Sequence, residues 1–118
     1  MNLRELDPRD VSEALKANKA VLIDVREPRE FATERLHGAS LHPLSTFDPA
    51  SLPVDGTRDV ILHCGSGKRS MTALMRCAEA GVNITAHMKG GLVGWKASGL
   101  PTVRIDPATG QVIDPLNA

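Results

Sequence analysis

The segment around Cys64 changes abruptly from a strand pattern to a helix pattern. Residues 60–63 form a short apolar, β-branched run, which is typical of a buried strand. Cys64 then opens a loop with two glycines and two cations, and residues 70–80 form a strong helical pattern that ends at Gly81. This order predicts that Cys64 lies at the carboxyl end of a strand, just before a helix N-terminus. In open α/β sheets, ligands bind at that edge.

The loop after Cys64 has the features that stabilise a thiolate. Gly65 and Gly67 allow backbone conformations that other residues resist, so several N–H groups can turn inward together. The helix adds free N–H groups and the positive end of its dipole, and Lys68 and Arg69 add cationic side chains. All three effects favour the nucleophilic thiolate over the thiol, and the same cradle would hold an anionic substrate. The competing interpretation is a buried apolar cysteine beside a plain glycine turn.

Length and charge exclude several classes of protein. A chain of 118 residues is long enough for one domain with a real core. Lys plus Arg and Asp plus Glu both number 14, so the formal charge is zero, which argues against binding to nucleic acid or an anionic membrane through bulk charge. No run approaches the length of a membrane span, and the first residues lack the apolar core of a signal peptide. Two cysteines make no disulfide framework and suit a reducing compartment, so we expect a cytoplasmic protein.

Strand and helix patterns alternate along the whole chain. Ala20–Val25 is a continuous apolar run of the kind that is buried on both faces of a parallel sheet. The alternation predicts an α/β domain with a central, mostly parallel sheet of about five strands flanked by helices. We expect strands at residues 3–6, 20–25, 59–63 and 82–88, a small strand or turn at 36–41, a helical turn within 43–53, and helices that begin near Pro8, Pro28, Ser70 and Gly90.

Four segments in order resemble the rhodanese family of single-domain sulfurtransferases. Val21–Glu27 is similar to the strand with the family's Asp-Val-Arg signature, and residues 64–69 resemble its Cys-x-x-Gly-x-Arg active loop. Leu36–Ala39 resembles its His-Ile-Pro-Gly-Ala segment, with one residue missing and no proline. Residues 90–101 resemble its closing Gly-Gly…Trp…Gly-x-Pro segment. The resemblance implies a three-layer rhodanese-like domain over residues 1–103, which leaves 104–118 as a C-terminal extension, either a hairpin or a loose tail.

The resemblance implies sulfur transfer through a covalent intermediate. The Cys64 thiolate would take the sulfane sulfur of thiosulfate or a persulfide donor and pass it to a thiol, a sulfur-relay protein or cyanide. The loop amides would hold the negative charge of the persulfide, and no cofactor is implied. The predicted site comprises Cys64 as nucleophile, a binding loop of Gly65, Ser66, Gly67, Lys68, Arg69 and Ser70, and the supporting residues Asp24, Arg26 and Trp95.

Arg69 has two interpretations that stay open at this point. It could attract the anionic donor, or it could be partly structural, with its guanidinium bracing the loop or pairing with Asp24 or Glu27. Asp24 fits a structural role, in which it accepts hydrogen bonds from neighbouring loop amides, better than proton transfer. Trp95 fits a packing anchor beneath the active edge better than the wall of a substrate mouth.

The second cysteine and the histidines fit structural roles. Cys77, on the helix after the loop, is interpreted as a core residue rather than a resolving thiol. His63 should point to the other face of its strand, and it makes a weak candidate for a general base. His37, His42 and His87 show no metal-ligand spacing with one another or with the cysteines, so no metal is predicted.

Two other functions remain open. The cell-cycle dual-specificity phosphatases share the implied fold and place a His-Cys pair before a glycine-rich loop, so a phosphatase or arsenate reductase is the competing enzyme class. Their loop has five residues between Cys and Arg and this chain has four, a smaller cradle that suits sulfur better than a tetrahedral phosphate. The non-enzymatic alternative is a sulfur carrier or redox-linked binding module with little turnover.

Overall fold

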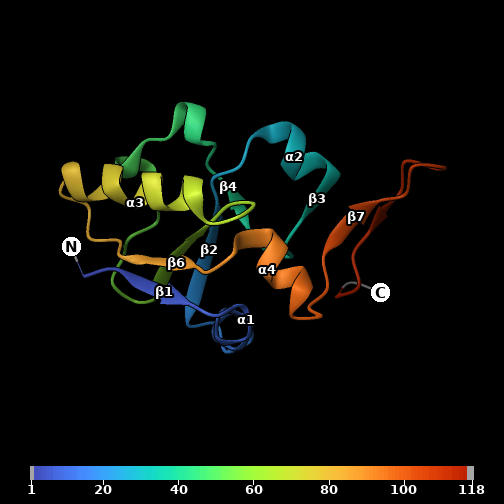
Figure 1. Ribbon diagram of the computed structural model, residues 1–118, viewed down its shortest axis with the longest axis horizontal. Coiled ribbons are helices and arrows are strands. Elements are labelled where there is room, and N and C mark those ends of the chain that lie inside the picture. Colours follow the sequence, from blue (N-terminus) through green and yellow to red (C-terminus); the bar gives the residue numbers. More distant parts are fainter. Residues whose placement is uncertain (1, 117–118) are drawn as a thin grey trace.

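A five-stranded parallel sheet forms the centre of the molecule (Figure 1). The structure is a computed structural model that describes residues 2–116. The strand order is β1-β6-β5-β2-β4, and every pairing in it is parallel. These strands are β1 (Arg4–Leu6), β2 (Ala20–Asp24), β4 (Ser40–Leu41), β5 (Asp59–His63) and β6 (Ala86–Met88). The predicted α/β class with about five mostly parallel strands is therefore confirmed. The predicted domain (1–103) and the predicted C-terminal extension (104–118) include residues 1, 117 and 118, which lie outside the described residues.

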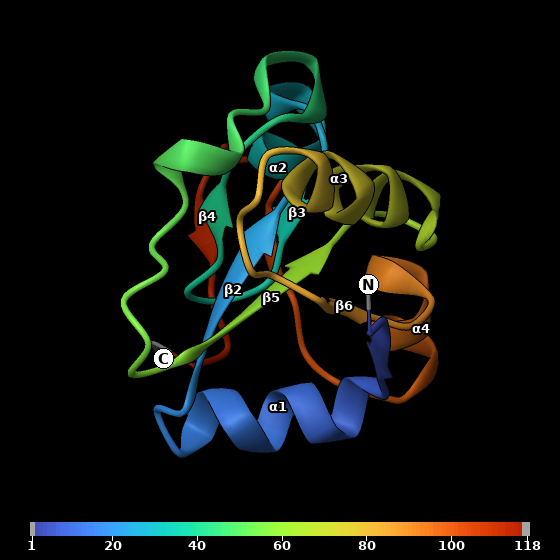
Figure 2. The same cartoon turned by 90° about the vertical axis from the view of Figure 1, so that its left-hand side faces the viewer.

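Helices cover both faces of the sheet and complete three layers (Figure 2). On one face lie α2 (Pro28–Thr33) and α3 (Lys68–Glu79), and on the other lie α1 (Pro8–Lys16) and α4 (Gly91–Ala97). Two short 3₁₀ turns, Leu44–Thr46 and Pro49–Ser51, occupy the predicted connecting region. Because successive strand residues point to opposite faces, each face has its own core.

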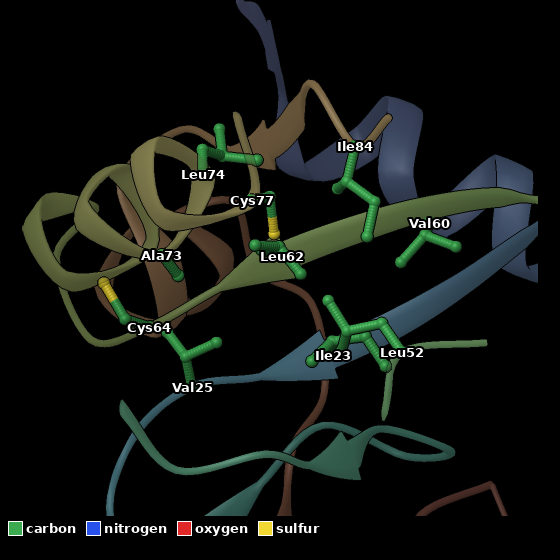
Figure 3. Packing of buried hydrophobic residues seen from close by; sticks show 10 residues of the cluster. All are labelled: Ile23, Val25, Leu52, Val60, Leu62, Cys64, Ala73, Leu74, Cys77 and Ile84. Carbon is green, nitrogen blue, oxygen red and sulfur yellow. The ribbon is translucent and has the colours of Figure 1, made fainter. Parts of the chain in front are cut away.

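The core on the α3 face surrounds the cysteines. α3 contributes Ala73, Leu74 and Cys77, which pack on residues from β2 and β5 such as Ile23 and Leu62 (Figure 3). Cys77 is fully buried there, which agrees with its interpretation as a core residue. The complete cluster comprises Ile23, Val25, Leu52, Val60, Leu62, Cys64, Ala73, Leu74, Cys77 and Ile84.

The core on the opposite face joins α1 and α4 to the sheet. Val11 from α1 and Leu92 and Trp95 from α4 pack against Leu22 and Ile61. β2 and β5 therefore bury both of their faces, which explains why their sequences read as continuous apolar runs.

A second, antiparallel sheet extends from one end of the molecule (Figure 1). It contains β3 (Glu34–Arg35), β7 (Val103–Ile105) and β8 (Val112–Ile113) in that order. Residues 103–113 thus form a hairpin, and β7 pairs with β3 through Arg35 and Val103. The sequence did not predict β3, because two residues are too short to show a period. The boundary predicted after residue 103 falls within β7 and stays a prediction.

Two element boundaries differ from the sequence-based expectation. α3 begins at Lys68 rather than Ser70, because the N-cap of the helix is Gly67, whose left-handed backbone starts the helix earlier. β6 begins at Ala86 rather than Val82, because the Val82 amide turns back to the Cys77 carbonyl and the Ile84 amide to the Val82 carbonyl. Within residues 2–116, every helix falls short of the length and apolar character that crossing a membrane requires.

Candidate active site

Cys64 lies at the carboxyl end of β5, the central strand of the parallel sheet. Its side chain is fully buried and points to the α3 face, above Val25 and beside Ala73 (Figure 3). The Gly67 amide donates a hydrogen bond to Cys64 Sγ at 3.0 Å. Gly67 has a φ of +105°, a left-handed conformation that glycine adopts at little cost. The loop therefore turns a backbone donor onto the sulfur, as a thiolate cradle requires.

The hydrogen bonds around the sulfur favour the thiolate. Burial by itself would raise the pKa of the Cys64 thiol, but hydrogen bonds from the Ser70 amide and hydroxyl and from the Gly67 and Ser66 amides outweigh it and lower that pKa. Among the described residues, no such donor faces Cys77, and burial raises the pKa of its thiol. Both cysteines are free. The chain therefore has one thiol that is activated and one that is not.

Arg69 is held at the mouth of the loop by Glu30 of α2. Its guanidinium donates to the two carboxylate oxygens of Glu30 at 2.6 and 3.0 Å, and both side chains are about a third exposed. These hydrogen bonds lower the pKa of Glu30 to about 2. The predicted pairing of Arg69 with Asp24 or Glu27 is wrong, because both carboxylates already have partners. Asp24 accepts from Arg26, and Glu27 accepts from Ser45.

Asp24 and Arg26 form a buried pair beside the strand end. The Asp24 carboxylate is fully buried and accepts from the Arg26 amide at 2.9 Å and from the Arg26 guanidinium at 2.8 to 3.1 Å. Arg26 also donates to the Glu34 carbonyl of β3 at 2.7 Å. The pair thereby ties the end of β2 to the second sheet. Within the described residues, neither side chain of the pair makes a hydrogen bond to the Cys64 sulfur.

His63 contacts the main chain of Cys64 rather than its thiol. Its Nδ1 lies 3.1 Å from the Cys64 carbonyl oxygen, and its Nε2 lies 3.5 Å from an Asp24 carboxylate oxygen. Burial lowers the pKa of His63, which keeps the ring neutral near physiological pH. The position agrees with the expectation that His63 points away from the thiol.

The first turn of α4 closes the loop from the opposite side. The Leu92 amide donates to the Cys64 carbonyl at 2.8 Å, and the Val93 amide donates to the Gly65 carbonyl at 3.0 Å. This approach requires Gly91, because a Cβ atom there would overlap the Cys64 carbonyl oxygen and lie 2.7 Å from the Gly65 carbonyl carbon. The glycine pair at residues 90–91 is thus explained by close backbone packing.

The predicted site residues separate into three groups in space. Cys64 and the loop of residues 65–70 surround the sulfur, and Asp24 and Arg26 lie behind the loop. Trp95 is apart from both groups: it is buried in the core on the opposite face, and its indole N–H donates to the Pro101 carbonyl at 2.8 Å. This position fits the packing anchor rather than the wall of a substrate mouth. The loop's polar groups are amides, hydroxyls and cations, which suit an anion.

Two further residues act on this site and were not predicted from the sequence. Glu30 fixes Arg69, and His87 of β6 contacts Ser70, whose hydroxyl lies 3.7 Å from Cys64 Sγ. Neither has a sequence signal of its own. Glu30 is one of several carboxylates in a charged segment, and His87 became a partner of Ser70 only through strand pairing.

Comparison with known proteins identifies a family and several relatives that match most of this chain. A family model described as "Rhodanese-like domain" matches residues 7–98. An uncharacterised protein of Synechocystis is 39% identical over 97 residues, which cover 82% of this chain and 54% of that protein. The chain thus spans about half the length of this relative. A protein of Allochromatium vinosum named "Sulfurtransferase" is 29% identical over 102 residues, 86% of this chain and 95% of that protein.

Solved structures show the same architecture. The crystal structure titled thiosulfate sulfurtransferase from Pseudomonas aeruginosa matches with a TM-score of 0.78 and 26% identity. The match covers 92% of this chain and 21% of that chain, so the similarity concerns about a fifth of the Pseudomonas aeruginosa protein.

Proposed function

Because this chain belongs to the rhodanese family over residues 7–98, we propose that it is a sulfurtransferase that carries sulfur on Cys64. The observation that carries the proposal is the buried Cys64 sulfur with backbone and hydroxyl donors directed at it. Relatives at 29% identity are named sulfurtransferase or thiosulfate sulfurtransferase, which supports the same chemistry. That the protein is cytoplasmic and needs no metal or cofactor stays a prediction.

The proposed reaction has two steps. The Cys64 thiolate attacks the outer sulfur of thiosulfate, a new S–S bond forms, and sulfite leaves with the electron pair of the broken S–S bond. A thiolate or cyanide then attacks the outer sulfur of the Cys64 persulfide, and the Cys64 thiolate leaves. Amides that stabilise the thiolate also stabilise the persulfide anion and the leaving thiolate, so one cradle serves both steps.

Substitution of Cys64 by serine is expected to abolish turnover. We expect formation of thiocyanate from thiosulfate and cyanide to fall by at least about 10³-fold in Cys64→Ser, because the hydroxyl is not ionised and forms no persulfide. Cys77→Ser is the matched control, since burial raises the pKa of that thiol. We expect the control to retain turnover.

Two other outcomes would favour different functions. Slow turnover in the wild type with rapid single transfer of sulfur to a protein thiol would indicate the carrier. Hydrolysis of an aryl phosphate that disappears in Cys64→Ser would favour the phosphatase over the sulfurtransferase.

Removal of the Glu30 charge should strengthen binding of an anionic donor. Glu30 neutralises Arg69 at the mouth of the loop, and its pKa of about 2 keeps it ionised throughout any ordinary assay. In Glu30→Gln we expect the KM for thiosulfate to fall about two- to fivefold with kcat unchanged, the size of an exposed ion-pair effect. Glu79→Gln, at the far end of α3, removes the same charge away from the loop and should leave KM unchanged. A KM that is unaffected in Glu30→Gln would show that Arg69 only braces the loop.

A further inference from the structure

His87 is a buried titratable side chain that the proposed reaction does not yet use. It lies on β6, between β5 and β1, with only 2% of its surface exposed. Its neighbours Ala86 and Met88 point into the α1–α4 core, so His87 points to the α3 face, where Cys64 lies. A buried imidazole on this face requires partners for both ring nitrogens.

Both ring nitrogens of His87 have partners. These contacts form a relay of polar groups that runs from the Cys64 thiol to the surface. His87 Nδ1 lies 2.7 Å from Ser70 Oγ, which lies 3.7 Å from Cys64 Sγ. His87 Nε2 lies 3.2 Å from a carboxylate oxygen of Glu5, its direct neighbour in the parallel pairing of β1 with β6. Cys64, Ser70 and His87 are buried, whereas the Glu5 side chain is 51% exposed. The relay therefore leads from a buried thiol to solvent.

The single hydrogen of the Ser70 hydroxyl restricts how the hydrogen bonds of this relay can be arranged. Its hydroxyl has one hydrogen and three acceptors within reach: His87 Nδ1, the Gly67 carbonyl and a Cys64 thiolate. When Cys64 is a thiol, its S–H can donate to Ser70 Oγ while the hydroxyl donates to His87 Nδ1. When Cys64 is a thiolate, the hydroxyl can turn to the sulfur, provided that His87 Nδ1 is protonated and donates to Ser70 Oγ in turn.

We propose that His87 accepts the proton of Cys64 through Ser70 and that Glu5 stabilises the imidazolium that results. The S–H bond breaks and an O–H bond forms on Ser70, while the former Ser70 hydrogen moves to His87 Nδ1, so Ser70 is unchanged in composition. His87 acts through Ser70 and is thus a positioning residue. The proposal rests on the proposed function, because it identifies the group that prepares the sulfurtransferase nucleophile.

The surrounding charges are consistent with this assignment. Within residues 2–116, Glu5 is the charged side chain that bonds to His87. From α3 the ring meets the neutral Ser70, and Lys68 of that helix is exposed. His63 of β5 faces the opposite side of the sheet with Asp24. The ion pair formed by Cys64 thiolate and His87 imidazolium would be separated by a single hydroxyl.

The pH dependence of alkylation tests the relay without a sulfur donor. We would measure the rate of Cys64 alkylation by iodoacetamide against pH in wild type, His87→Gln, Ser70→Ala and the His87→Gln/Ser70→Ala double variant. In His87→Gln and in Ser70→Ala we expect the apparent pKa of Cys64 to rise by about one unit, which slows alkylation about tenfold at neutral pH. The double variant should be no slower than the slower single variant, because either change breaks the same chain.

His37→Gln is the matched control, since His37 is exposed and bonds to Asp114 in the hairpin region. An unchanged profile in a folded His87→Gln variant, or single effects that add in the double variant, would overturn the proposal. If His87→Gln does not fold, NMR titration of the His87 ring decides. By linkage, the pH midpoint of that ring should fall in Cys64→Ala relative to wild type, and an unchanged midpoint would refute the relay. Because none of these measurements uses a sulfur donor, a normal relay in a protein that forms no persulfide would contradict only the proposed function.

Discussion

Gly91→Ala is expected to destabilise the protein by about 3 kcal/mol or more and to disable the Cys64 loop. Gly91 has a φ of +56°, which disfavours any Cβ atom, and its Cβ would overlap the backbone of Cys64 and Gly65. Relief of that overlap requires α4 to move away, which would break the Leu92 and Val93 hydrogen bonds that clamp the loop. Urea unfolding measures the loss of stability, and the rate of Cys64 alkylation measures the loss of the cradle.

Gly99→Ala separates the two causes. Gly99 has a comparable φ of +76°, but a Cβ atom there meets nothing within 4 Å. This control should cost about 1–2 kcal/mol from the left-handed backbone alone and leave the alkylation rate unchanged. Equal losses of stability in Gly91→Ala and Gly99→Ala would mean that the overlap between α4 and the loop adds nothing to the free-energy cost of the Gly91 substitution.

Asp24→Asn is the second substitution with a large expected effect. The change leaves the buried guanidinium of Arg26 without its charged partner, which costs about 3–5 kcal/mol when one member of a buried pair is removed. Because Arg26 also holds the Glu34 carbonyl, we expect the second sheet to lose protection from hydrogen exchange together with the loop. Chemical unfolding and hydrogen exchange measure these effects.

The control for this change is an exposed pair in the same protein. Asp59→Asn makes the same chemical change opposite Arg4, where both side chains are more than a third exposed and the guanidinium also bonds through two nitrogens. Solvent screening should limit its cost to below about 1 kcal/mol. A similar cost in both variants would show that burial of the Asp24–Arg26 pair does not decide its contribution.

The elements with strong local patterns could be predicted from the sequence. The apolar runs at residues 20–25 and 59–63 indicate strands buried on both faces, and the structure places them side by side at the centre of the parallel sheet. The order of strand, Cys64, glycines and helix also predicts a cysteine at the sheet edge before a helix N-terminus. In these segments, the chemistry of a few adjacent residues determines the backbone conformation, so a local pattern is sufficient to predict it.

The contacts between distant segments could not be predicted in the same way. Several carboxylates in the sequence are candidates for an ion pair with Arg69. Glu30 forms that pair, whereas Asp24 and Glu27 accept hydrogen bonds from other residues. His87 faces Ser70 and Glu5 only because of the register of β6 against β1 and β5. A shift of that register by one residue would turn His87 into the opposite core. Such contacts depend on tertiary packing, for which the sequence carries no local signal.

The central claim is that Cys64 carries the transferred sulfur, and the intact mass of the protein tests it most directly. After incubation with thiosulfate, we expect the wild type and Cys77→Ser to gain the mass of one sulfur atom, and cyanide to remove it. Cys64→Ser should gain nothing. A wild-type protein that gains no sulfur from thiosulfate or from a persulfidated thiol, or a Cys64→Ser variant that gains as much as the wild type, would contradict the account.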